Sequence, residues 1–160
     1  MPNSYDPVER AMSYRMDYEE PISDVVTRLV QEHEEIDRKL KRISEISSNR
    51  DRNLRVAISL LNSVSTEILR HAIEEEARLA RVIMESDETR KSSDESVKIL
   101  QEHRRIREFF DDELPYVMDE NSEKQTRKMI TEFVEFLIKH HKEEEEELFP
   151  LSLRAASSSR

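Results

Sequence analysis

Histidine and glutamate are the residues of this chain whose type and spacing could do chemistry, as ligands of a metal. The 160 residues include five histidines and no cysteine, which excludes thiolate sites and cysteine nucleophiles. His71 and His140 are each followed four residues later by a glutamate, Glu75 and Glu144. Residues four apart share one face of an α-helix, so each pair can direct an imidazole and a carboxylate at one centre. Such ligands without sulfur suit iron, manganese or zinc.

An internal repeat brings two further histidines, His33 and His103, into the same argument. Residues 32–36 (EHEEI) echo residues 102–106 (EHRRI), and residues 71–79 echo residues 140–148, at offsets of 70 and 69 residues. This repetition predicts two similar helix pairs related by a pseudo-two-fold axis, with the histidines meeting near it. Buried imidazoles and carboxylates lose their hydration and need partners. Two metal ions sharing the two glutamates would satisfy all six groups.

A purely structural interpretation stands beside the metal site. One histidine in an apolar stripe is usually a hydrogen-bonded core residue, and one His-x-x-x-Glu is a common surface pair. Here, however, four of the five histidines fall in four different stripes, and two of them precede a carboxylate at the same spacing. This conjunction favours a metal site over a metal-free polar layer in a helical interaction module.

Four amphipathic helices must position these residues. Apolar residues recur every three or four positions in stripes over residues 26–43, 54–82, 99–117 and 126–148, and each stripe contains one of the four histidines. A charged, serine-rich linker is predicted at residues 85–95. Pro115 is expected to bend or end the third helix, and Pro150 to stop the fourth. Short connections make neighbouring helices antiparallel, so the predicted fold class is all-α, an antiparallel up-down four-helix bundle.

Composition and domain limits agree with this fold. The chain has no glycine, 39% charged residues and 6% aromatic residues, which disfavours a β-sandwich or barrel with its tight turns. Asp6 and Pro7 predict a helix start within an N-terminal arm or short helix at residues 1–20. The bundle is expected over residues 21–151 and a flexible tail over residues 152–160.

Charge and hydropathy limit the partners. The formal net charge of −10 argues against nucleic acid or an anionic membrane surface as a partner, because such binding needs clustered lysine and arginine. The sequence has no apolar run long enough for a transmembrane helix and no apolar signal core at the N-terminus. The absence of cysteine is compatible with a reducing compartment. We therefore expect a cytoplasmic protein.

The motifs resemble those of a known family. His33, His71-x-x-x-Glu75-Glu76, His103 and His140-x-x-x-Glu144-Glu145, with the ending Leu148-Phe149-Pro150, are similar to the hemerythrin-like (HHE) cation-binding domain over residues 22–151. The resemblance implies a four-helix bundle with two iron ions, oxo- or hydroxo-bridged, and leaves manganese or zinc as alternatives. It implies His33, His71, His103 and His140 as terminal ligands, and Glu75 and Glu144 as bridges. The repeat suggests His33 with His71 on one metal and His103 with His140 on the other.

Ferritin-like di-iron proteins are a different family of metal-binding bundle, and the spacing argues against them. They place a glutamate three residues before a histidine on two of their helices. None of the five histidines here has an acidic residue at that position. The ferritin-like interpretation is therefore rejected.

The chain also departs from the pattern of the oxygen carriers in the hemerythrin family. Those proteins have a second histidine four residues after that of the third helix, and here the position holds Arg107, which cannot be a ligand because it stays protonated. Glu145 remains an alternative to Glu144, Asp37 is a spare carboxylate, and His141 is expected to be an outer or surface residue.

The missing imidazole favours binding or sensing of oxygen, nitric oxide or iron over oxygen transport. A di-iron oxidoreductase linked to peroxide or nitric oxide is the alternative. The expected partner is therefore a small molecule such as oxygen or nitric oxide. A homodimer is left open.

Overall fold

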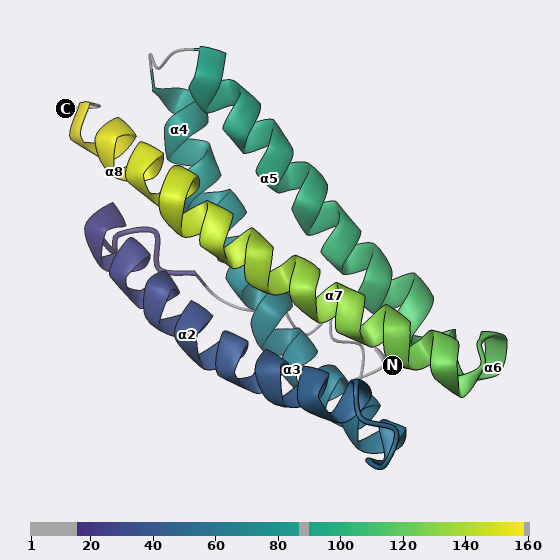
Figure 1. Ribbon diagram of the computed structural model, residues 1–160. Coiled ribbons are helices and arrows are strands. Elements are labelled where there is room, and N and C mark those ends of the chain that lie inside the picture. Colours follow the sequence, from purple (N-terminus) through teal and green to yellow (C-terminus); the bar gives the residue numbers. More distant parts are fainter. Residues whose placement is uncertain (1–15, 87–89, 159–160) are drawn as a thin grey trace, which may run out of the picture.

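The computed structural model describes residues 16–86 and 90–158, and this part of the chain is helical without a strand. Four long helical segments alternate in direction, so that each runs antiparallel to the next (Figure 1). The predicted all-α four-helix bundle is therefore confirmed. The first two segments comprise α2 (Ile22–Ser47), then α3 (Leu54–Glu74), the π-helical turn η1 (Glu75–Ala80) and α4 (Arg81–Glu85).

The third and fourth segments are also interrupted helices. The third comprises α5 (Arg90–Glu108), the π-helical turn η2 (Phe109–Glu113), the 3₁₀ turn η3 (Leu114–Tyr116) and α6 (Val117–Glu120). The fourth comprises α7 (Glu123–Glu143), the π-helical turn η4 (Glu144–Leu148) and α8 (Phe149–Ser158). Pro115 lies in the 3₁₀ turn, where the third helix was predicted to bend or end.

Polar side chains define the helix ends in a chain without glycine. Ser122 and Gln125 form a reciprocal capping box at the start of α7, which satisfies backbone N–H groups that have no partner within the helix. At the end of α2, Arg127 of α7 donates hydrogen bonds to the carbonyl oxygens of Ile46, Ser47 and Asn49. Helices often end at a glycine in the left-handed conformation. Here the guanidinium of Arg127 donates hydrogen bonds to the last carbonyl oxygens instead.

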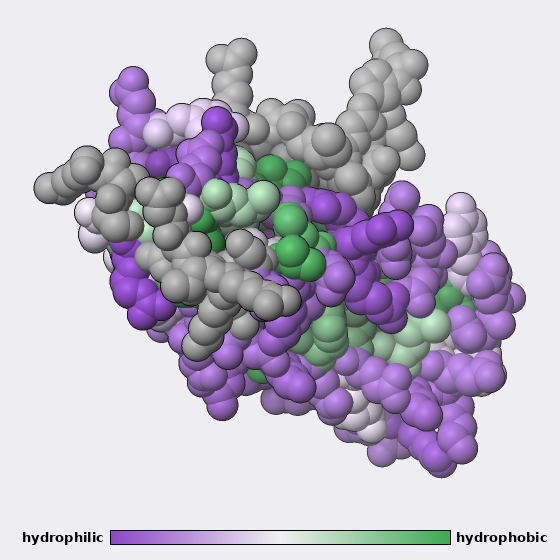
Figure 2. Space-filling view, turned by 90° about the horizontal axis from the view of Figure 1, so that it is seen from above, coloured by the Kyte–Doolittle hydropathy of each residue, from purple (hydrophilic) through white to green (hydrophobic). Residues whose placement is uncertain are grey.

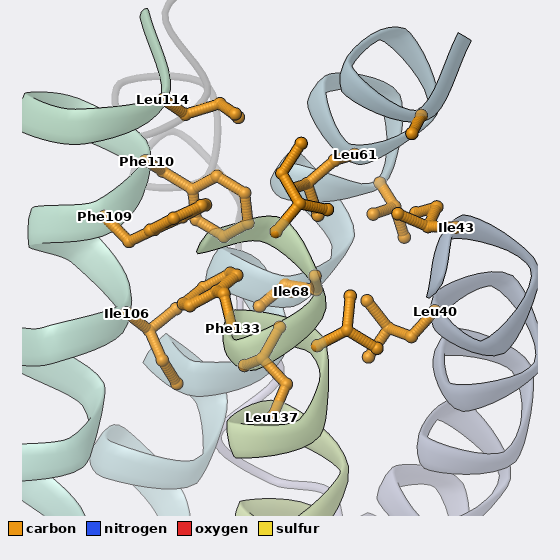
Figure 3. Packing of buried hydrophobic residues seen from close by; sticks show 14 of the residues in the cluster. Leu40, Ile43, Leu61, Ile68, Ile106, Phe109, Phe110, Leu114, Phe133 and Leu137 are labelled. Carbon is orange, nitrogen blue, oxygen red and sulfur yellow. The ribbon is translucent and has the colours of Figure 1, made fainter. Parts of the chain in front are cut away.

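The hydrophobic core is divided in two along the bundle. One cluster includes Leu40, Leu61, Ile106 and Phe133, and Figure 3 shows side chains of all four helical segments meeting in it. The second cluster gathers near the opposite ends of the helices and consists of Val25, Val26, Leu29, Leu79, Ile83, Ile99, Leu148, Phe149, Leu151 and Ala155. On each helical segment the predicted histidine lies between the residues of the two clusters. The core therefore holds a polar layer.

The fourth segment continues where the sequence suggested that it would stop. Pro150 falls in the first turn of α8, where the missing N–H of proline is tolerated, directly after the wider π-helical turn. Residues 152–158 are helical, and Ser152 and Ala155 are buried against the bundle. These residues were expected to form a flexible tail, and in the structure they continue the helix beyond the proline, with part of it packed on the bundle.

The linker and the N-terminal arm also differ from expectation. The predicted linker at residues 85–95 is shorter, since α5 already begins at Arg90. The predicted helix start at Asp6 and Pro7 lies outside the described residues. Residues 16–20 form a turn before α2, and Arg78 donates hydrogen bonds to the carbonyl oxygens of Asp17 and Glu20 there.

The surface matches the charged composition. In the view from above, hydrophilic residues cover most of the described surface, with smaller groups of hydrophobic residues among them (Figure 2). In the described part of the chain, no helix has the length and apolar character needed to cross a membrane.

Candidate metal centre

The six predicted ligands all lie in the polar layer between the two hydrophobic clusters. His33 comes from α2, His71 from α3, His103 from α5 and His140 from α7, while Glu75 and Glu144 begin the π-helical turns η1 and η4. Their exposed fractions range from 0% to 3%. The fold thus brings together residues that are up to 111 positions apart in the sequence.

The six side chains form two groups that share both glutamates. One group contains His33, His71, Glu75 and Glu144, and the other contains Glu75, His103, His140 and Glu144. Within each group one potential ligand atom of every residue lies within 4.8 Å of the others. The structure therefore pairs His33 with His71 and His103 with His140, as the repeat suggested.

Each glutamate faces histidines of both groups. Glu75 Oε2 lies 3.3 Å from His71 Nε2, while its Oε1 lies 3.2 Å from His103 Nε2. Glu144 Oε1 lies 3.2 Å from Nε2 of both His33 and His140, and its Oε2 lies 3.3 Å from His103 Nε2. Two carboxylates placed in this way could bridge two cations.

A second ring of carboxylates surrounds the histidines at their other ring nitrogen. Glu32 lies 3.2 Å from His71 Nδ1, and Glu102 contacts His140 Nδ1. These two contacts are equivalent by the repeat, because each glutamate directly precedes the histidine of the neighbouring helix. A carboxylate on the second nitrogen fixes the tautomer and orientation of an imidazole that binds metal through the first.

The other two outer carboxylates directly follow the two central ones. Glu76 Oε1 lies 3.3 Å from His103 Nδ1, and Glu145 Oε1 lies 3.3 Å from His33 Nδ1. All four outer glutamates stand in the repeated strings of the sequence, yet their role was missed there. The sequence repeat was the available signal, but only the bundle decides which histidine each glutamate faces.

The central glutamates begin π-helical turns at corresponding places in the two halves. Single π-helical turns within α-helices occur often at functional sites, because they shift the register of the side chains that follow. After the shift, Leu79 and Leu148 still point into the core, while Glu75 and Glu144 remain in the polar layer. The helix irregularity therefore coincides with the predicted site.

Several buried atoms of the cluster have no hydrogen-bond partner. They include Nε2 of His33 and His71, both carboxylate oxygens of Glu75, and Oε1 of Glu144. A buried polar atom without a partner costs about 1–3 kcal/mol, and more if it is charged. Imidazole nitrogens and carboxylate oxygens that converge in this way fit a metal cation, which would satisfy them together.

Burial and charge interactions within the cluster shift the pKa values of its members in opposite directions. Burial is the main cause that lowers the pKa of His33 to about 3. For His71 burial is outweighed by the charge of Glu75 and the hydrogen bond to Glu32, which raise its pKa to about 10. For His140 burial is likewise outweighed, mainly by the charge of Glu144, which raises its pKa to about 9. The carboxylates thus attract positive charge, which a metal cation would supply in place of protons.

A family model described as the hemerythrin HHE cation binding domain matches residues 24–152. The chain belongs to this family. No curated protein and no solved structure matches the sequence of this chain significantly. Membership and the buried His/Glu groups together indicate a site that could hold a metal cation.

Arg107 stands four residues after His103 in this hemerythrin HHE domain, at the position where the oxygen carriers are expected to have a second histidine. Its guanidinium pairs with Glu76, whose other oxygen faces His103. Burial alone would raise the pKa of Glu76, but His103 and Arg107 together lower it. Arg107 therefore acts on the cluster through an outer carboxylate of the hemerythrin HHE domain.

The structure distinguishes the two adjacent candidates on the fourth helical segment. Glu144 is fully buried among the Nε2 atoms, whereas the side chain of Glu145 is 38% exposed and faces Nδ1 of His33. Glu144 thus has the position of a central ligand in the hemerythrin HHE domain, and Glu145 has that of an outer carboxylate.

Buried His141 pairs with partly exposed Asp37 beside the two ligand groups. Nδ1 of His141 lies 2.6 Å from Oδ1 of Asp37, and neither residue belongs to a ligand group. The expectation of an outer position for His141 agrees with this contact, but a surface position does not, because His141 is buried. The sequence did not show that α2 covers this side of α7.

A large surface groove lies away from this chemistry. Its volume is about 810 Å³, and its lining includes Arg50, Lys128, Thr131 and Glu135 but none of the six cluster residues. Arg127 also lines it, with its guanidinium already bonded to backbone carbonyls. The buried cluster is therefore the candidate functional site of the hemerythrin HHE domain.

Proposed function

We propose that this chain binds two iron ions in the buried cluster. His33 and His71 would hold one ion, His103 and His140 would hold the other, and Glu75 and Glu144 would bridge them. The observation that carries this proposal is the set of buried imidazole and carboxylate atoms that face one another and have no hydrogen bond. Iron is proposed from the family resemblance, and the same nitrogen and oxygen ligands would also accept manganese or zinc.

The outer carboxylates support the proposal because they supply what bound histidine ligands need. Glu32 and Glu102 hold Nδ1 of His71 and His140, which leaves Nε2 to face the centre. Charge balance supports it as well, since the two buried central carboxylates need positive charge nearby, and a metal cation can supply it in place of protons on His71 and His140. A metal-free structural role would explain the His–Glu pairs of the cluster. It would leave unexplained the buried central atoms that have no hydrogen bond.

We further propose that the site binds or senses a small molecule such as oxygen or nitric oxide, or senses iron itself. Bound iron supplies coordination positions and electron transfer to such molecules. The chain supplies the buried layer that excludes water and the carboxylates that orient the imidazoles. Arg107 leaves the third helix with one histidine in the cluster, so fewer protein ligands are available than in an oxygen carrier.

The test is metal analysis of the purified protein combined with its absorption spectrum. After anaerobic reconstitution with Fe²⁺, we expect about two iron ions per chain, as in di-iron bundles, and an absorbance in air that bleaches on reduction. Glu75→Ala should lose bound iron, whereas Glu147→Ala, an exposed residue of the acidic run that contains Glu144, should retain it. A colourless, iron-free protein after this treatment would refute the proposal.

A di-iron oxidoreductase is the second candidate, and the replacement of a ligand by Arg107 is the observation that favours it. Open coordination positions permit turnover of peroxide or nitric oxide as well as binding. Steady turnover that is lost in Glu144→Ala and retained in Glu147→Ala would identify an enzyme. Stoichiometric binding without turnover would identify a binding or sensing protein.

A further inference from the structure

The two halves of the bundle differ around the fifth histidine. At the repeat offset of 69 residues, His141 corresponds to Ala72, and Phe149 corresponds to Ala80. At the offset of 70 residues, Asp37 corresponds to Arg107. The four predicted histidine ligands and their outer glutamates follow the repeat, whereas His141, Phe149 and Asp37 do not. The environments of His33 and His103 are therefore chemically different.

In addition to the tilted ring of His71, two aromatic rings lie nearly parallel to the imidazole of His33. The imidazole of His141 stacks on it with ring centroids 4.1 Å apart and an angle of 21° between the planes. The phenyl ring of Phe149 also lies nearly parallel to it, at 5.4 Å and 15°. Among the described rings none stacks on His103, whose contact with His140 is edge-on at 5.1 Å and 71°.

The stacked imidazole of His141 is itself held in place. Its Nδ1 lies 2.6 Å from Oδ1 of Asp37, and Asp37 stands four residues after His33 on α2. One turn of α2 thus carries both the predicted ligand and the carboxylate that fixes the neighbouring ring. His141 connects α7 to α2 at the level of the cluster.

The outer carboxylates explain why His33 needs this support. Glu76, which faces His103, is itself anchored by Arg107. Glu145, which faces His33, is 38% exposed, and no cation among its described contacts anchors it. Metal ligands must be held within about 10–20° of their productive orientation by surrounding contacts. On the His33 side, stacking supplies part of that restraint.

We propose that His141 and Asp37 are a positioning pair that holds His33 in the orientation needed to bind a cation, and that the two metal positions are therefore inequivalent. The inference rests on the proposed function. Retention of the ion at His33 and His71 depends on the pair, and retention of the ion at His103 and His140 does not.

The first test measures iron release. Wild-type protein and His141→Ala are loaded with Fe²⁺ without oxygen and challenged with a chelator. Losing a residue that orients a ligand typically costs 10–100-fold in affinity, so one of the two ions should leave about 10–100-fold faster from the variant. The other ion should leave at the wild-type rate. Unchanged release of both ions, or equal acceleration of both, overturns the proposal.

The second test identifies the affected position. His141→Ala is combined with His103→Ala, which disables the other position, and separately with His33→Ala, which disables the position under study. Faster release is expected in the His103→Ala background and no change in the His33→Ala background. General loosening of the bundle would accelerate release in both, and that outcome, or an effect confined to the His33→Ala background, overturns the proposal.

A variant at the other end of the pair guards against misfolding of His141→Ala. Asp37→Ala leaves both rings in place and should accelerate release of the same ion. The double variant should lose no more than one single variant, because both changes remove one interaction. Full additivity of the two effects would contradict a pair.

The two proposals can fail separately. Wild-type protein that binds no iron overturns the proposed function and the positioning pair with it. Wild-type protein that holds two iron ions, with release unaffected by His141→Ala and Asp37→Ala, leaves the proposed function intact and overturns the pair alone.

Discussion

At the scale of the residue, each central histidine makes contacts through both ring nitrogens. Nε2 faces the central carboxylates, and Nδ1 faces an outer one that comes from a neighbouring helix. The contacts run from α2 to α3, from η1 to α5, from α5 to α7 and from η4 back to α2. This closed circuit links all four helical segments through the predicted ligands.

A prediction about a single residue follows from the circuit. Glu102→Ala removes the carboxylate from Nδ1 of His140, so the imidazole is no longer fixed. We expect metal affinity to fall about 10–100-fold, as measured by competition with a chelator. Glu108→Ala on the same helix, which breaks an exposed ion pair with Arg104, is the matched control. Equal affinity of the Glu102 and Glu108 variants would argue against an orienting role for Glu102.

At the scale of the element, the helices are held in register by polar contacts between them as well as by the core. Arg127 of α7 reaches the last carbonyls of α2 and also donates a hydrogen bond to the carbonyl oxygen of Arg52 in the α2–α3 connection. Ser47 at the same end of α2 lies 2.8 Å from the hydroxyl of Thr131. This end of the bundle lies beyond the larger hydrophobic cluster, away from the polar layer.

Replacing Arg127 should therefore destabilise the bundle without changing its metal chemistry. Arg127→Ala leaves buried carbonyls without donors, which costs about 1–3 kcal/mol. Chemical denaturation should show this loss, with little change in metal stoichiometry. Lys128→Ala, an exposed neighbour, should change the free energy of unfolding by no more than about 0.5 kcal/mol. An unchanged free energy of unfolding in Arg127→Ala would mean that water satisfies these carbonyl oxygens as well as the guanidinium does.

At the scale of the whole molecule, the polar layer separates the two hydrophobic clusters, so the site interrupts the core that stabilises the fold. Buried charges that lack partners destabilise the folded state unless something neutralises them. A metal ion that binds only the folded chain would both neutralise the layer and tie the four helical segments together.

Removal of metal should accordingly lower the melting temperature. A ligand present at 100 times its dissociation constant stabilises by about 2.7 kcal/mol per site. For a chain of this size, 1 kcal/mol corresponds to about 2–4 °C. A difference of at least about 5 °C between loaded and chelated protein is therefore expected by calorimetry. Identical melting temperatures would instead favour a metal-free helical module.

Much of this organisation follows from local periodicity in the sequence. An amphipathic helix buries one stripe, so the stripes predicted the helices, and the histidines within them, at His33, His71, His103 and His140, were predicted to be buried. The repeat suggested which histidines pair. The spacing of the motifs is also a local property of the sequence, so the resemblance to a family of metal-binding domains could be seen without the structure.

Only the tertiary structure decided the features that depend on which helices are neighbours. It separated Glu144 from Glu145, assigned an outer carboxylate to each predicted histidine, and buried His141 against Asp37. It also extended the last helix past Pro150, because packing against the bundle outweighs a local stop signal. Sequence spacing fixes the face of a helix on which a side chain lies, whereas its partner depends on long-range packing.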